Sequence, residues 1–326
     1  MGMEKPKKSS IERVVGNISE TERERIMEKK TERFNDQIFE DLAEKEREKS
    51  PEELQLIEIA NDLTNEIRRQ YGLENFDVPA ENIHIIKKEK WPENYDSTSA
   101  FYNSELQGVV MEDHHSRLVL TARMLHEMLH FKSYNALQVT KEADPKLKAY
   151  RVGLTVVTRK GNEIYFRSLN EAVTEEMAKR LTTELSGNPL LSDEVKQTQK
   201  IMAENKHVRP AFTEDTFFAA IKKEVIKNKD ESQTTKIQVT SNDFVYKQQR
   251  KMLNTLVDKI FDRNPEKFTN KEEVFGVFAK GMMTGNILPI GKLMDKTFGQ
   301  GIFNKFSEMD KNRQAVDEQE KFIESL

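Results

Sequence analysis

The segment from Ser116 to Phe131 (SRLVLTARMLHEMLHF) constrains the fold of this chain more than any other. It contains no glycine or proline, and its apolar residues cover most sides of a helix: Leu118, Ala122, Met124, Leu125, Met128, Leu129 and Phe131. A helix that is apolar on most of its circumference is expected inside a domain. His126, Glu127 and His130 on this helix therefore need partners, because unpaired polar groups are costly to bury.

These three polar residues form the pattern HExxH, which is typical of zinc-dependent hydrolases. Residues i and i+4 share one face of a helix, so the imidazoles of His126 and His130 can converge on one metal ion. Glu127 would then lie beside the metal, where it can take a proton from water. The alternative is that each histidine bonds a nearby carbonyl or carboxylate without any metal, but the pattern on a buried helix favours ligation.

A third ligand is expected on a second helix that begins near Ser168, where Glu171 and Glu175 lie one turn apart on the same face. One carboxylate can bind the metal while the other accepts a hydrogen bond from the free ring nitrogen of a ligand histidine. Two alternatives remain at this point. Ser168 and Glu171 could form a capping box without a metal, and Glu176 could replace Glu175 or Glu171 as a weaker ligand.

Residues 116–185 resemble the gluzincin group of zinc metallopeptidases, the thermolysin-like zincins, because HExxH is followed by the segment Asn170-Glu171-Ala172-Val173-Thr174-Glu175. The resemblance implies an α+β, zincin-like catalytic domain that acts on a peptide or protein. It implies that His126, His130 and Glu171 hold one zinc ion per chain, that Glu127 is the general base, and that Glu175 bonds a ligand histidine. The gap between His130 and Glu171 is longer than in that family, and no transition-state histidine motif follows.

A hairpin predicted at residues 150–167 accounts for this gap, with alternating Val152, Leu154 and Val156 and a turn at residues 160–162. Because it lies between the two metal-binding helices, one of its ends should approach the metal. Four side chains there are candidates to stabilise an oxyanion. Tyr150 and Arg151 are preferred over Tyr165 and Arg167. The other histidines are expected elsewhere: His84 in strand packing, His114 and His115 at a solvated helix start, and His207 on the surface.

Three regions are predicted along the chain. Residues 1–50 are rich in both charges and are expected to form a mobile arm with one or two weak helices. Residues 51–190 form the catalytic domain, with a capped helix from Pro51 to Gly72, a strand at 82–88 and two short strands at 98–112 that could pair with an extended peptide. Residues 191–326 are expected to be mainly helical, with helices at 213–227, 241–261 and 269–283.

Composition and charge restrict the type of metal site and the functional classes that this chain can belong to. The chain of 326 residues has no cysteine, so any metal must be held by histidine and carboxylate. Its 52 basic and 56 acidic residues are interspersed, which indicates no nucleic-acid footprint. No apolar run approaches a membrane span and residues 1–10 do not resemble a secretory signal, so a cytoplasmic protein is expected. A non-catalytic metal-binding protein, a metal-free helical interaction protein, and manganese, iron or cobalt in place of zinc remain as alternatives.

Overall fold

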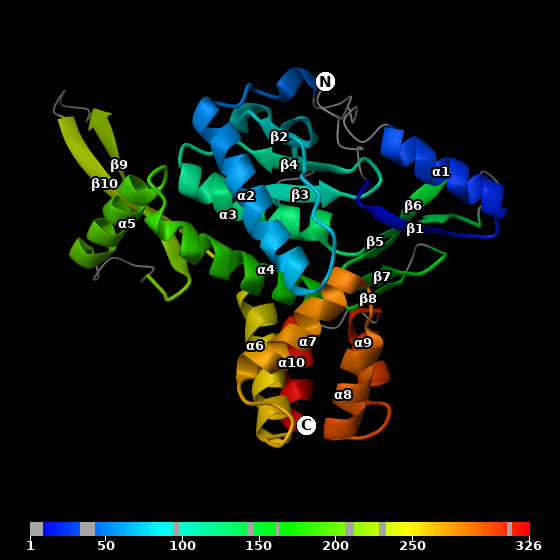
Figure 1. Ribbon diagram of the computed structural model, residues 1–326. Helices are drawn as coiled ribbons and strands as arrows, with labels where there is room; N and C mark the ends of the chain where they lie inside the picture. The colour runs from blue at the N-terminus through cyan, green and yellow to red at the C-terminus, as the bar shows by residue number, and fades with distance from the viewer. Residues whose placement is uncertain are drawn as a thin grey trace.

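The computed structural model describes residues 9–32, 43–93, 98–141, 146–160, 163–205, 212–227, 233–311 and 315–326. The fold is α+β, as predicted, with three small sheets of five, three and two strands. Helices and sheets are interleaved in the first half of the chain, whereas the helices from α6 (Lys247–Asp262) to α10 (Val316–Ser325) gather at one end of the molecule (Figure 1). Within the described residues, no helix is both long and apolar enough to cross a membrane.

The three-stranded sheet lies next to the helix that carries the HExxH pattern. Its central strand β4 (Gly108–Glu112) is parallel to β2 (Ile83–Ile86) and antiparallel to the edge strand β3 (Ala100–Asn103). Helix α3 (Arg117–Lys132) packs on β3 and β4, and α2 (Pro51–Gln70) packs on α3. The capping box predicted for α2 is present, because Ser50 and Glu53 exchange side-chain to backbone hydrogen bonds.

The five-stranded sheet contains an element that the sequence did not predict. Strand β1 (Ile11–Val15) pairs in parallel with β5 (Asn135–Val139), which directly follows α3. Ile11 and Val14 are buried against β5, so this part of residues 1–50 belongs to the sheet and not to a solvated arm. The few apolar residues of β1 show no periodicity in the sequence. They are buried by β5, which lies far along the chain, so the local sequence gives no sign of this strand. Helix α1 (Glu20–Glu32) buries no residue, as expected for a weak helix.

The predicted hairpin is a three-stranded meander in the structure. Strand β6 (Leu147–Val152) turns at Gly153 into β7 (Thr155–Val157), which pairs with β8 (Ile164–Tyr165). The prediction of one strand through Val152, Leu154 and Val156 was wrong at Gly153, whose φ of +57° bends the chain. A side chain at residue 153 would also meet Asn170 on α4 (Arg167–Glu184), so the glycine lets the meander approach α4 closely.

Replacing Gly153 by alanine should destabilise the protein by about 2–4 kcal/mol, because the left-handed backbone disfavours a Cβ and the added atom overlaps a packed neighbour. That Cβ would lie 2.4 Å from Asn170 Oδ1 and 2.8 Å from Met282 Cγ. Gly187→Ala is the matched control, since a Cβ there meets nothing within 4 Å. Urea unfolding of both variants measures the difference, and equal midpoints would contradict the packing argument.

The second half of the chain is less helical than predicted. The helix expected at residues 213–227 is strand β9 (Thr216–Lys227), which pairs antiparallel with β10 (Gln233–Asp243). The apolar residues near the start of β9 are compatible with either an amphipathic helix or a strand. The strand forms because β10 is present to pair with it. The hairpin and α5 (Ser192–Glu204) lie together at one side of the molecule (Figure 1).

Helices α6 (Lys247–Asp262) and α7 (Lys271–Thr284) correspond to the helices predicted at residues 241–261 and 269–283. They are followed by α8 (Leu288–Phe298), α9 (Ile302–Lys311) and α10 (Val316–Ser325), where the sequence predicts only a mainly helical region. Helix α6 begins later than expected, because residues 241–243 belong to β10. One cluster of buried apolar side chains extends from α2 and α3 through α4 into α6, α7 and α8, so it crosses the proposed boundary at residue 190.

Candidate metal centre

Helix α3 is buried over almost its whole length, as its sequence indicates. Every residue from Leu118 to Lys132 is buried except Arg123. The Ser116 side chain caps the helix by accepting a hydrogen bond from the Val119 N–H. Glu194 on α5 accepts hydrogen bonds from the Ser116 hydroxyl and from the Leu118 N–H, which places a carboxylate at the positive end of the helix dipole.

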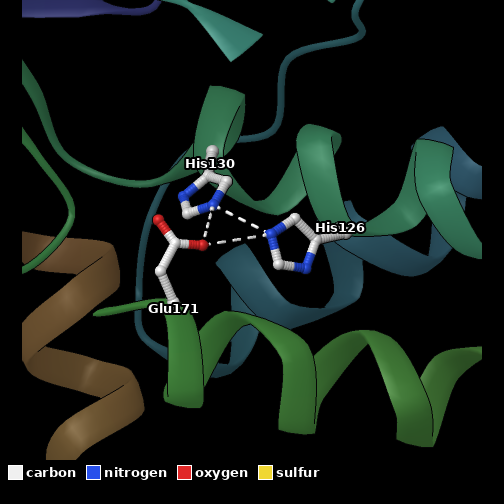
Figure 2. A group of neighbouring side chains, drawn as sticks. All are labelled: His126, His130 and Glu171. Carbon is white, nitrogen blue, oxygen red and sulfur yellow. Dashed lines mark hydrogen bonds and ion pairs between the residues drawn. The ribbon is translucent and has the colours of Figure 1, made fainter. Parts of the chain in front are cut away.

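Three side chains converge between α3 and α4 (Figure 2). His126 Nε2 lies 3.1 Å from His130 Nε2, and each of these nitrogens lies 3.3 Å from Glu171 Oε2. Donor atoms about 2.0–2.1 Å from a tetrahedral zinc ion are about 3.3 Å apart, so this triangle has the size of a zinc site. Both histidines are buried, at 6% exposed, and together with Glu171 they line a cavity of about 460 Å³.

Glu171 is not occupied in capping α4, because the capping box with Ser168, the alternative to metal ligation, does not form. Helix α4 follows Phe166, which has a left-handed backbone and makes no side-chain cap bond. Ser168 instead donates from its hydroxyl to Asp310 Oδ1 at 2.6 Å. Burial alone would raise the pKa of Glu171, but the neighbouring His130 and His126 hold it well below its ordinary value. Glu171 is therefore a carboxylate, as a metal ligand must be.

Glu175 joins the histidine pair to a distant part of the chain. Its Oε2 lies 2.6 Å from His126 Nδ1, and its Oε1 accepts a hydrogen bond of 2.7 Å from the Val245 N–H. A carboxylate at Nδ1 favours the proton there, so the proton that metal binding displaces would come from Nε2, whose lone pair then faces the group. Glu176 turns away from the group and pairs with Arg180 and Arg250.

Asn170 connects the meander to the second histidine. Its Oδ1 accepts a hydrogen bond of 2.8 Å from the Leu154 N–H, and its amide nitrogen lies 3.4 Å from His130 Nδ1. The backbone oxygen of His130 accepts hydrogen bonds from the Ser133 hydroxyl and the Asn135 amide. These contacts position the ring of His130 at the end of α3.

Glu127 lies beside the histidine pair and lines two adjoining cavities of about 290 and 460 Å³. Burial raises the pKa of Glu127, although the charges of His126 and His130 oppose the shift. The Tyr102 backbone bonds to the Glu127 carboxylate, which places the edge strand β3 against the site. A carboxylate with a raised pKa beside a candidate metal is suited to exchange protons with a reacting group.

The side chains predicted to stabilise an oxyanion are placed differently from the expectation. Neither Tyr150 nor Arg151 lines the two cavities. Arg151 donates to the backbone oxygens of Gly153 and Gly285, because the turn at Gly153 directs the end of β6 toward α7. Of the two weaker candidates, Arg167 lines the larger cavity, whereas Tyr165 contacts Lys311.

The structure adds Tyr246, which the sequence analysis did not single out. Its ring stacks on the His126 imidazole, with centroids 5.6 Å apart and planes 19° from parallel, and it lines both cavities. Burial, followed by the charges of Glu171 and Glu127, raises the pKa of Tyr246, so its hydroxyl stays protonated and can donate a hydrogen bond. Tyr246 follows β10 and has a left-handed backbone with a φ of +54°. No sequence motif predicts this conformation.

The other histidines lie away from this group. His84 is buried and bonds Glu46, as expected for strand packing. His114 and His115 stack with centroids 4.3 Å apart, and both rings meet Phe218 edge-on. His207 lies outside the described residues. Among the residues that the structure describes, His126, His130 and Glu171 form the one group arranged to hold a metal ion.

His114 should make the protein less stable as the pH falls from 6.5 to 4. Burial, and then the neighbouring His115, lowers the pKa of His114 to about 4, below its ordinary value of 6.5. In that interval the unfolded chain binds a proton that the folded chain does not, so the free energy of unfolding decreases with falling pH. Urea unfolding at several pH values should give a smaller decrease for His114→Asn than for the wild type. An equal decrease would contradict a lowered pKa.

No protein family, curated protein or solved structure was found to match this chain.

Proposed function

We propose that this protein is a zinc-dependent metallopeptidase with a zincin-like, thermolysin-type arrangement. The observation that carries the proposal is the triangle of His126 Nε2, His130 Nε2 and Glu171 Oε2, with sides of 3.1–3.3 Å, beside the buried carboxylate of Glu127. Two imidazoles and one carboxylate are a donor set found in catalytic zinc sites that keep one position open.

Zinc fits the residues present. The donor separations match a tetrahedral ion, Glu171 is ionised, and Glu175 directs the lone pair of His126 into the group. When bound, zinc would supply Lewis acidity, which lowers the pKa of a water molecule and polarises a carbonyl. Manganese, iron or cobalt could bind the same donors, so the metal identity is part of the proposal.

Two side chains would carry the proton and charge changes of peptide hydrolysis. Glu127 would take a proton from the attacking water and return it to the leaving amine, which suits a carboxyl group whose pKa is raised. Tyr246 would donate its phenol proton as a hydrogen bond to the oxygen that becomes negative when the carbonyl is attacked. It takes the role that the sequence analysis assigned to Tyr150 or Arg151.

The edge strand β3 would hold the substrate. Among the described strands it pairs with β4 alone, and its other edge faces Glu127 through the backbone of Tyr102. An extended peptide can add to such an edge by main-chain hydrogen bonds. Ser99 lines only the smaller of these two cavities, whereas Phe101 and Tyr102 line only the larger one. A peptide antiparallel to β3 would therefore have its C-terminal part over the smaller cavity.

The test is zinc-dependent cleavage of a mixture of synthetic peptides, read by mass spectrometry. Protein loaded with one equivalent of zinc should cleave the peptides, a chelator should stop cleavage, and added zinc should restore it. Zinc-loaded, folded protein that leaves every peptide intact would contradict the peptidase and favour a non-catalytic zinc protein. Failure to bind zinc would favour a metal-free interaction protein.

A further inference from the structure

The smaller cavity lies over the two turns of α3 that precede His126. Val119, Ala122 and Arg123 line it from α3 at the positions expected for one helix face. Phe217 on β9 and Phe244 after β10 form part of the opposite wall. The cavity of about 290 Å³ is large enough for an amino-acid side chain, and it opens beside the metal group through His126 and Glu127.

Arg123 is the unusual residue in this wall. It is the one position between Leu118 and Lys132 that is not buried, although its side chain is only 16% exposed. One guanidinium nitrogen, Nη1, donates to the Glu112 backbone oxygen at 3.1 Å and lies 3.8 Å from Glu112 Oε2. Among the described residues, no hydrogen bond engages Arg123 Nε or Nη2. A half-satisfied arginine therefore lines the part of the cavity where its neighbours on α3, Val119 and Ala122, are apolar.

Three acidic side chains line the cavity, and each already has a partner. Glu127 is bonded by the Tyr102 backbone. Glu175 bonds His126 and the Val245 N–H through its two oxygens. Asp243 accepts from the Thr216 hydroxyl with one oxygen and from Lys247 with the other, both at 2.6 Å. None of these three carboxylates is bonded to Arg123, so within the described part of the chain its Nε and Nη2 donors are available to an anion that enters the cavity.

We propose that Arg123 selects substrates by binding a carboxylate on the C-terminal side of the scissile bond. This inference rests on the proposed function. Arg123 and His126 are neighbours at i and i+3 on α3, and a strand advances about 3.3 Å per residue, so the residue that follows the scissile bond lies within reach of the guanidinium. The carboxylate can come from an aspartate or glutamate side chain or from the C-terminus of a short peptide. Arginine recognises either one through paired N–H donors.

Equilibrium binding of product-like peptides tests the pocket without requiring turnover. The probes are Asp-Ala-amide against Asn-Ala-amide, and Ala-Ala with a free carboxylate against Ala-Ala-amide. A charge-assisted hydrogen bond corresponds to about a 10- to 100-fold preference for the acid in one of these pairs. The preferred pair identifies the side chain or the C-terminus as the source. Arg123→Met should abolish the preference, whereas Arg117→Met, an earlier arginine on α3, should keep it.

Cleavage-site profiles supply the second measurement. The wild type should favour peptides with an acidic residue, or the chain end, directly after the scissile bond. Arg123→Glu should reverse the preference toward lysine and arginine, which a merely structural role of Arg123 would not do. Zinc content and thermal unfolding of each variant show that it is folded.

The outcomes separate the two proposals. Equal affinity for acid and amide probes, or no binding of any probe, overturns the role of Arg123 even if the protein is an active peptidase. A preference for the acid that is lost in Arg123→Met supports that role, and the absence of any cleavage would then contradict the peptidase alone.

Discussion

Replacing Glu171 by alanine should nearly abolish zinc binding, whereas Glu176→Ala should leave it intact. The wild type should hold about one zinc per chain, because its three donors already have the spacing of a tetrahedral site. Loss of a hydrogen-bonding partner of a ligand costs about 10- to 100-fold in affinity, so Glu175→Ala should fall in that range and Glu171→Ala beyond it. Elemental analysis and competition with a chromophoric chelator measure these affinities.

Thermal unfolding gives an independent measurement of the same site. Zinc at 100 times its dissociation constant should stabilise the wild type by about 2.7 kcal/mol, because it binds the folded chain and not the unfolded one. The same zinc concentration should shift the melting temperature of Glu171→Ala very little. An unchanged zinc content in Glu171→Ala would exclude Glu171 as the third ligand and with it the proposed metal centre.

Replacing Glu127 by glutamine should lower kcat by about 100- to 10,000-fold while zinc remains bound. Glutamine has nearly the shape of glutamate, and Glu127 is not one of the three residues proposed to bind the metal. Its amide cannot take a proton from water at neutral pH, so only the proton transfer is removed. The measurement is steady-state cleavage of a peptide found in the screen, with zinc content determined on the same samples.

Glu66→Gln, on the surface of α2, is a control that should retain full activity. Full activity of a zinc-loaded Glu127→Gln variant would rule out Glu127 as the general base. Loss of zinc together with activity would instead assign Glu127 a structural role in the site.

Local sequence patterns were enough to predict several parts of this protein. Helix α2 with its capping box, the buried helix α3, and helices α4, α6 and α7 all appear close to their predicted positions. The i, i+4 spacing brings His126 and His130 together on α3, and Glu171 on α4 meets them as expected. These features depend on contacts within one or two helical turns, or on the packing of two strongly amphipathic helices.

The predictions that failed involve partners far apart in the chain. The expected helix at residues 213–227 became β9 because a second strand was present to satisfy its backbone. Ile11 and Val14 lie in a sheet because β5 covers them. Arg151 bonds the Gly285 backbone and does not line the candidate metal centre, because Gly153 reverses the chain where a continuous strand was expected.

The sequence by itself therefore determined that His126 and His130 share one face of α3, because this spacing has the same effect in any α-helix. Only the tertiary structure decided what surrounds the pattern. The Tyr246 ring stacks on His126, and the Val245 N–H bonds Glu175, because the β9–β10 hairpin brings residues 245 and 246 back to α3 and α4. Such contacts depend on which surfaces pack together, and packing is a collective property of the whole core that no local pattern encodes.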